Sequence, residues 1–79
     1  MAVRNLAEAL AEDIADVGLA ELVAPGSLKA TESDTLVELE QEADLIRVYE
    51  GGEQIAEYST SDEQFNEKLM ATLATSLNF

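Results

Sequence analysis

The chain has no cysteine, no histidine and no tryptophan, and it contains a single proline. Without cysteine it forms neither a disulfide nor a thiolate metal site. Without histidine it also lacks the commonest general base and the commonest metal ligand. No apolar run approaches the length of a membrane span. We therefore expect a protein that is not an enzyme, holds no cofactor or metal and does not enter a membrane.

The remaining polar motifs do not supply the missing chemistry. The serines have no imidazole partner, so nucleophilic catalysis of the serine–histidine type is excluded. The pair Gly51-Gly52 is not followed by the Lys-Ser/Thr of a phosphate-binding loop. No D-x-D-x-D-G segment is present, which argues against a specific calcium site.

Positive charge is also scarce: four Lys and Arg residues face 17 Asp and Glu residues, giving a net charge of −13. This balance disfavours direct binding to nucleic acid or to an anionic membrane and favours a basic protein surface as the partner. Solubility or adaptation to high salt explains the charge equally well. The hydrophobic content of 47% is too high for a disordered acidic tail, so we expect residues 1–79 to form a single small acidic domain.

An apolar repeat near the N-terminus predicts helical structure over residues 3–23. Gly18 is placed to end the first helix in a left-handed conformation, with residues 19–23 adding another turn. Asn5 has capping-box spacing to Glu8. The repeat forms one stripe that we expect to face the core, and its members are Val3, Leu6, Leu10, Ile14 and Val17.

Residues 27–59 have the composition and alternation of strands. Leu28 and Ala30 begin a short strand, and the run 35–40 alternates between apolar and acidic residues. Two further runs flank Gly51-Gly52 and predict a hairpin with a two-residue turn. The cross-strand pairs expected from that turn are Glu50–Glu53, Val48–Ile55 and Ile46–Glu57.

The segment 61–77 predicts the second helix. Ser61 and Gln64 have capping-box spacing, and an i, i+4 stripe follows at Phe65, Leu69, Leu73 and Leu77. The fold class is therefore α+β: a two-layer sandwich with an N-terminal helix, a small antiparallel sheet of three to four strands and a C-terminal helix (α-β-β-β-α).

Two surfaces are candidate binding sites. The first is an acidic ridge on the sheet and at the hairpin tip, consisting of Glu38, Glu40, Glu42, Glu50, Glu53 and Glu57. The second is the neutral side of the C-terminal helix, because no charged residue occurs from Leu69 to Phe79. A helix packed on the core with a weakly polar outer side would explain this pattern. The alternative is a packing interface, with the same chain or with another, that comprises Ala71, Thr72, Thr75, Ser76 and Phe79.

These features support two functions. The first is a non-enzymatic acidic protein that occupies a basic surface of a partner. It would be a nucleic-acid-mimicking inhibitor of the kind that phages and mobile elements direct against nucleases and CRISPR complexes. The second is a structural or assembly subunit, such as a virion or tail component of a halophilic or phage system, with acids for solubility and a homodimer through the C-terminal helix. Both place the protein in the cytoplasm, that of the host cell if it is viral.

Overall fold

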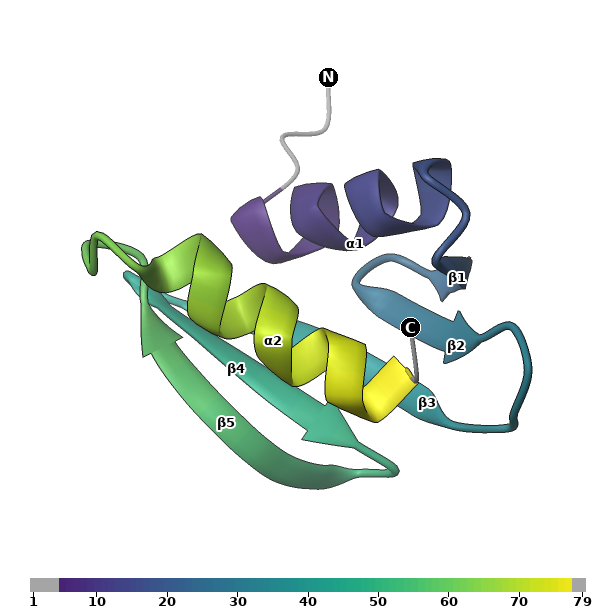
Figure 1. The fold of residues 1–79 in the computed structure, drawn as a ribbon. Coiled ribbons are helices and arrows are strands. Elements are labelled where there is room, and N and C mark those ends of the chain that lie inside the picture. The colour runs from purple at the N-terminus through teal and green to yellow at the C-terminus, as the bar shows by residue number, and fades with distance from the viewer. Residues whose placement is uncertain (1–4, 78–79) are drawn as a thin grey trace.

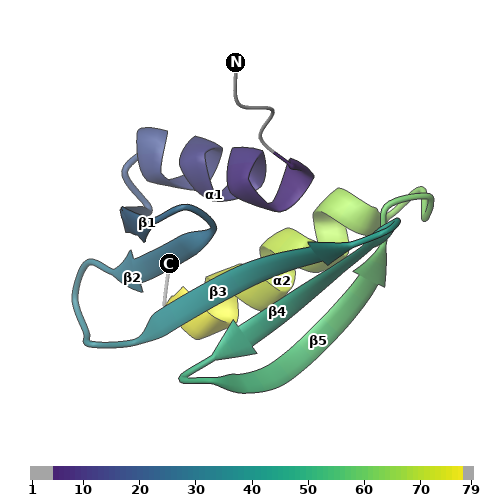
Figure 2. The same ribbon diagram turned by 180° about the vertical axis from the view of Figure 1, so that it is seen from behind.

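The computed structural model describes residues 5–77, which form two layers: a five-stranded antiparallel sheet and two helices on one of its faces (Figures 1 and 2). The order of the strands in the sheet is their order in the chain, so each strand pairs with its sequence neighbour. The predicted α+β class is confirmed, with five strands in place of three to four. The elements are α1 (Leu6–Asp16), β1 (Ala20–Ala24), β2 (Ser27–Ala30), β3 (Leu36–Glu42), β4 (Leu45–Glu50), β5 (Glu53–Ser59) and α2 (Phe65–Leu77).

Both ends of α1 have the caps that the sequence predicts. The side chain of Asn5 accepts a hydrogen bond from the backbone N–H of Glu8 at 2.9 Å. Gly18 follows the helix with a φ of 83°, a left-handed conformation that glycine adopts without a Cβ clash. The N–H of Leu6 also donates to the side-chain oxygen of Gln41 at 2.7 Å, which ties the start of the helix to β3.

The chain does not continue as a helix to residue 23, and this part of the prediction is wrong. Residues 20–24 form β1, which pairs antiparallel with β2 so that Ala20 lies opposite Ala30 and Leu22 opposite Leu28. Alanine, leucine and glutamate favour helices intrinsically, but helix propensity is a weak preference that tertiary context overrides. Pairing with β2 satisfies the backbone groups on one edge of this segment.

The buried face of α1 also differs from the prediction. The buried residues of the helix are Ala7, Ala11 and Ile14, and Val17 of the predicted stripe has 69% of its surface exposed. Leu6 is exposed as well, and Val3 lies outside the described residues. Small side chains let a helix approach a sheet closely, and α1 lies against β1, β2 and β3. Of the predicted stripe, Ile14 is buried as expected and Leu10 packs against the core, whereas Leu6 and Val17 lie beside the contact.

The core lies between the helix layer and one face of the sheet. Strands β2, β3 and β4 supply alternate buried residues, and α2 supplies an i, i+4 stripe that the sequence predicts correctly. Since side chains alternate across a strand, the other residues of these strands point to the opposite face, which neither of the two described helices covers (Figures 1 and 2). The principal buried residues are Leu28, Val37, Leu39, Ile46, Val48, Phe65, Leu69, Leu73 and Leu77.

The hairpin between β4 and β5 contains a bulge that changes its register. Glu50 lies opposite Glu53 as predicted, but the register shifts at Val48/Tyr49. Val48 then pairs with Ala56, and Ile46 with Tyr58, so the predicted Val48–Ile55 and Ile46–Glu57 pairs are wrong. An extra residue in one strand moves every later side chain to the other face. As a result Glu57 lies on the uncovered face, opposite Arg47.

Two local details complete the fold. Gly26, in the turn between β1 and β2, has a φ of 78°, and a Cβ there would lie 2.9 Å from the carbonyl oxygen of Leu39. The α-helix α2 begins at Phe65 rather than near residue 61, and Asp62 rather than Ser61 accepts the N–H of Gln64, at 2.8 Å.

Neither of the helices described has the length and apolar character needed to cross a membrane.

Candidate functional site on the uncovered sheet face

The uncovered face of the sheet brings acidic residues from two strands around one arginine. Glu38 and Glu40 of β3 point to this face because their neighbours Val37 and Leu39 are buried on the other. In the register of the sheet, Glu40 lies opposite Arg47 of β4, and Arg47 lies opposite Glu57 of β5. Three neighbouring strands therefore place carboxylate, guanidinium and carboxylate in one row across the sheet.

Arg47 contacts three carboxylates at once. Its Nε donates to Oε2 of Glu57 at 2.8 Å, and its Nη2 donates to Oε1 of Glu42 at 3.2 Å. Its Nη1 lies 3.8 Å from Oε1 of Glu40. We call these four residues the Arg47 cluster. The planar guanidinium presents several N–H donors in fixed directions, which suits it to hold more than one carboxylate.

The ionisation of the cluster follows from these contacts. The hydrogen bond from Arg47, together with its positive charge, lowers the pKa of Glu42 below the ordinary value of a glutamate. The hydrogen bonds to Glu42 and Glu57 raise the pKa of Arg47. Only 21% of the Arg47 side chain is exposed, whereas the side chains of its three partners are 41–68% exposed. The cluster thus presents carboxylates outward and holds them in place from beneath.

The six acidic candidates separate into two groups. Glu38 lies on the same face as the Arg47 cluster, opposite Tyr49, and is exposed. Glu50 and Glu53 face each other at the hairpin turn, and Glu50 lies opposite Val37, so the register assigns them to the edge of the helix-covered side. The predicted ridge is therefore not continuous: four residues share the sheet face, and the tip pair lies apart from them.

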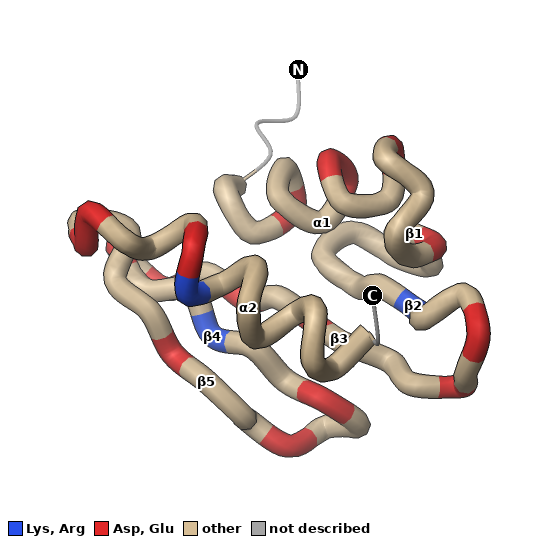
Figure 3. Tube along the Cα trace, in the orientation of Figure 1, with Lys and Arg blue, Asp and Glu red and all other residues tan. Residues whose placement is uncertain are grey.

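Acidic residues also occur well beyond this face. They are present on α1, in the loop between β2 and β3, at the hairpin turn and at the start of α2 (Figure 3). The described part of α2 after Lys68 carries no charge (Figure 3). The charge is thus spread over most of the surface, and the uncovered sheet face is distinguished by the ordering of its acids rather than by containing all of them.

The neutral side of α2 borders the outer strand β5. Ala71, Thr72, Thr75 and Ser76 line a shallow depression together with the exposed Ile55. The hydroxyl of Thr72 forms a hydrogen bond with the hydroxyl of Tyr58 on β5, and the hydroxyl of Thr75 donates to the backbone carbonyl of Ala71 at 3.1 Å. Thr72 therefore helps to hold α2 on the sheet. Phe79, the fifth predicted member of this interface, lies outside the described residues.

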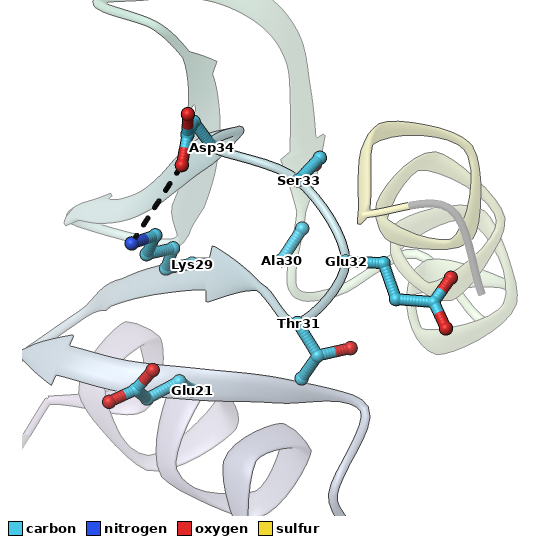
Figure 4. A pocket seen from close by; sticks show the side chains of 7 residues that line it. All are labelled: Glu21, Lys29, Ala30, Thr31, Glu32, Ser33 and Asp34. Atoms are coloured by element: carbon cyan, nitrogen blue, oxygen red, sulfur yellow. Dashed lines mark ion pairs between the residues drawn. The ribbon is translucent and has the colours of Figure 1, made fainter.

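A polar depression beside the loop between β2 and β3 holds no converging set of reactive groups. Lys29 and Asp34 form an ion pair at 4.0 Å across it, while the side chain of Glu32 points away from Lys29 (Figure 4). The Asp34 side chain is fully exposed and that of Lys29 is about half exposed, so solvent screens the pair. Within residues 5–77, no three Asp or Glu side chains are arranged to hold a metal ion.

Comparison of the chain with protein-family models, with curated proteins and with solved structures gives no match. The arrangement of the site is therefore the basis for its interpretation. Arg47 is the member that the sequence reasoning missed. Its position opposite Glu40 follows from a two-residue turn at Ala43-Asp44, so counting outward from that turn would have identified it.

Proposed function

We propose that this protein is a non-enzymatic binding protein whose uncovered sheet face occupies a basic surface of a partner. The observation that supports this best is the Arg47 cluster. Three carboxylates and one guanidinium leave two negative charges, and Glu38 on the same face adds a third. Because the carboxylates are held on sheet positions, a partner's Lys and Arg side chains meet acids that are already ordered, which lowers the entropic cost of binding.

The spacing of these acids supports nucleic-acid mimicry as the form of the interaction. Alternate residues on a strand are about 6.7 Å apart, a separation comparable with that of successive phosphates along one nucleic-acid strand. The partner would then be a nucleic-acid-binding protein, and the protein an inhibitor of a nuclease or of a CRISPR complex, of phage or mobile-element origin. On this proposal it acts in the cytoplasm of the host cell and binds neither nucleic acid nor membrane directly.

A second candidate is a structural or assembly subunit from a halophilic or phage system. The spread of acids over α1, the loops and the start of α2 favours it, since general solubility needs charge on every exposed face. The neutral side of α2 would then be the contact between subunits, including a homodimer. Ala71 and Thr75 are its exposed members.

Matched charge reversals test the first proposal. Glu38→Lys changes the uncovered face, whereas Glu32→Lys makes the same change in net charge in an exposed loop. No ion pair is described for either residue within residues 5–77. A partner is first captured from a lysate of the source cells at low and high salt and identified, and binding kinetics to that purified partner are then measured for wild type and both variants.

We expect Glu38→Lys to slow association severalfold more than Glu32→Lys and to flatten its salt dependence, because charges at a rim mainly set the association rate. Equal association rates for the two variants would indicate that the acids of the sheet face serve solubility and not partner binding. In that case Ala71→Glu with Thr75→Glu tests the second candidate. Loss of oligomers in sedimentation experiments would support a subunit contact on α2, whereas a wild type that is monomeric throughout would reject it.

A further inference from the structure

An apolar groove lies between the two helices, on the side of the molecule opposite the uncovered sheet face. Its volume is about 370 Å³. Apolar side chains from α1, from α2 and from the connection between α1 and β1 make up most of its lining, with Asp13 and Asn66 as the polar members. The apolar members are Leu10, Ile14, Val17, Leu19, Leu69 and Met70.

The groove exists because the apolar stripe of α1 enters the core only in part. Ala7 and Ala11 face the sheet, so Val17 remains 69% exposed beside the groove and Met70 on the facing helix is 37% exposed. Ile14 and Leu69 are buried beneath them and form the floor. Unpartnered large side chains around a concave floor are typical of sites that bind an apolar helix face.

Acidic residues flank the groove on both helices. Asp13 lines it on the α1 side. On α2, Glu67 precedes Met70 by three residues and therefore lies on the same side of that helix. Of the basic residues within 5–77, Lys29 and Arg47 belong to the sheet and Lys68 pairs with Asp62 at 2.7 Å, and none of them lines the groove.

We propose that this groove binds a cationic amphipathic helix of another protein. Apolar residues at i, i+3, i+4 and i+7 would lie on the floor, and Lys or Arg at the edges of that stripe would meet the acidic flanks. Residues 10 to 17, which comprise the C-terminal part of α1 and its cap Val17, span about 10 Å, enough to contact about two turns of such a helix. The flexible side chain of Met70 adapts to different apolar residues.

Electrostatic repulsion disfavours a second copy of this chain as the occupant of the groove. Two molecules that meet groove to groove would bring Asp13 and Glu67 of each close to the same acids of the other, at a net charge of −13 each. The proposal is independent of the function assigned to the sheet face, because the two surfaces lie on opposite sides of the sheet.

The probe for the test is a synthetic Leu/Lys peptide of about 18 residues with leucines in the helical pattern. Two control peptides accompany it: a scramble of the same composition, and a version with Glu in place of Lys. Binding to the intact protein is followed by fluorescence anisotropy. We expect the scramble to bind at least tenfold more weakly than the patterned peptide and the acidic version not to bind.

The matched variants are Val17→Ser with Met70→Gln in the groove, and Ile55→Ser as an apolar position outside it that is about as exposed as Met70. The groove variant should lose at least tenfold in affinity, and Ile55→Ser should leave it unchanged. Amide chemical shifts of the labelled wild-type protein test the site without any substitution, and they should change around Val17 and Met70.

Three results of the peptide experiments would each overturn the proposal. They are full affinity in the groove variant, a scramble that binds as well as the patterned peptide, and shift changes that centre on the Arg47 cluster. Self-association of the wild type that the groove variant abolishes would also overturn it, because the occupant would then be a second copy.

Discussion

Raising the concentration of potassium chloride from about 0.15 M to about 1 M should stabilise this fold, because counterions screen the mutual repulsion of its acids. The described chain has a radius of gyration of 11.6 Å, which corresponds to a sphere of about 15 Å radius, while an unfolded chain of this length occupies one of about 35 Å. Folding therefore concentrates a charge of −13 into a much smaller volume.

The size of the effect follows from Coulomb's law with screening. At a Debye length of about 8 Å, spreading this charge over the two spheres costs about 8 kcal/mol in the folded state and about 2 kcal/mol in the unfolded state. At the Debye length of about 3 Å that applies in about 1 M salt, the costs for the folded and unfolded states fall to about 4 and about 1 kcal/mol. The free energy of unfolding should therefore rise by about 3 kcal/mol, and the Tm by about 15 °C.

Thermal and urea unfolding followed by circular dichroism at the two salt concentrations measures this rise. The matched control replaces Glu32, Glu53 and Glu63 with Gln, all of them exposed. Three fewer acids leave a net charge of about −10, and because the energy varies as the square of the charge, the salt response should fall to about 60% of the wild-type value. A wild-type stability that is flat or falls with salt, or an equal response in the control, would refute the reasoning.

Two further predictions concern single positions. Gly26→Ala should lower the free energy of unfolding by about 2 kcal/mol in urea titrations, because a Cβ meets a backbone carbonyl of β3 at a positive φ; a loss below about 0.5 kcal/mol would show that the turn relaxes freely. The contact with Arg47 lowers the pKa of Glu42 in the folded state, so its stabilising contribution is present above the unfolded-state pKa and is lost as the pH falls through the lowered value. In urea titrations between about pH 5 and about pH 3, the free energy of unfolding of Glu42→Gln should therefore fall less than that of the wild type. An equal fall in the two proteins would contradict this.

The fold class follows from local patterns in the sequence. Alternation in β3 identifies its buried face, and the i, i+4 stripe of α2 identifies the helix and its core residues. The segment of β1 was missed because Ala-Glu-Leu-Val-Ala has no alternation and contains helix formers, so only pairing with β2 makes it a strand. The face of α1 is predicted only in part: Ile14 is buried as expected, but the stripe of large residues is a stronger pattern than the alanines that meet the sheet.

The candidate site was predicted in part. The alternation of β3 correctly gives Glu38, Glu40 and Glu42 a common face. Glu57 joins them only because of the bulge in β5, which a two-residue turn with regular pairing does not predict. The pattern of acids alone does not predict Arg47, because the register between β3 and β4 determines which basic residue lies among the carboxylates.

The pairing of every strand with its sequence neighbour has a consequence for how the chain folds. Each hairpin closes only a short loop, so the entropy lost before native contacts form is small, and chains with such local contacts fold quickly for their size. The exceptions are the two helices: α1 also lies against β3, and α2, the last described element, lies against β3 and β5. During synthesis the sheet can pair before α2 has emerged from the ribosome, so the growing chain exposes the apolar side of β3–β5 until α2 packs against it.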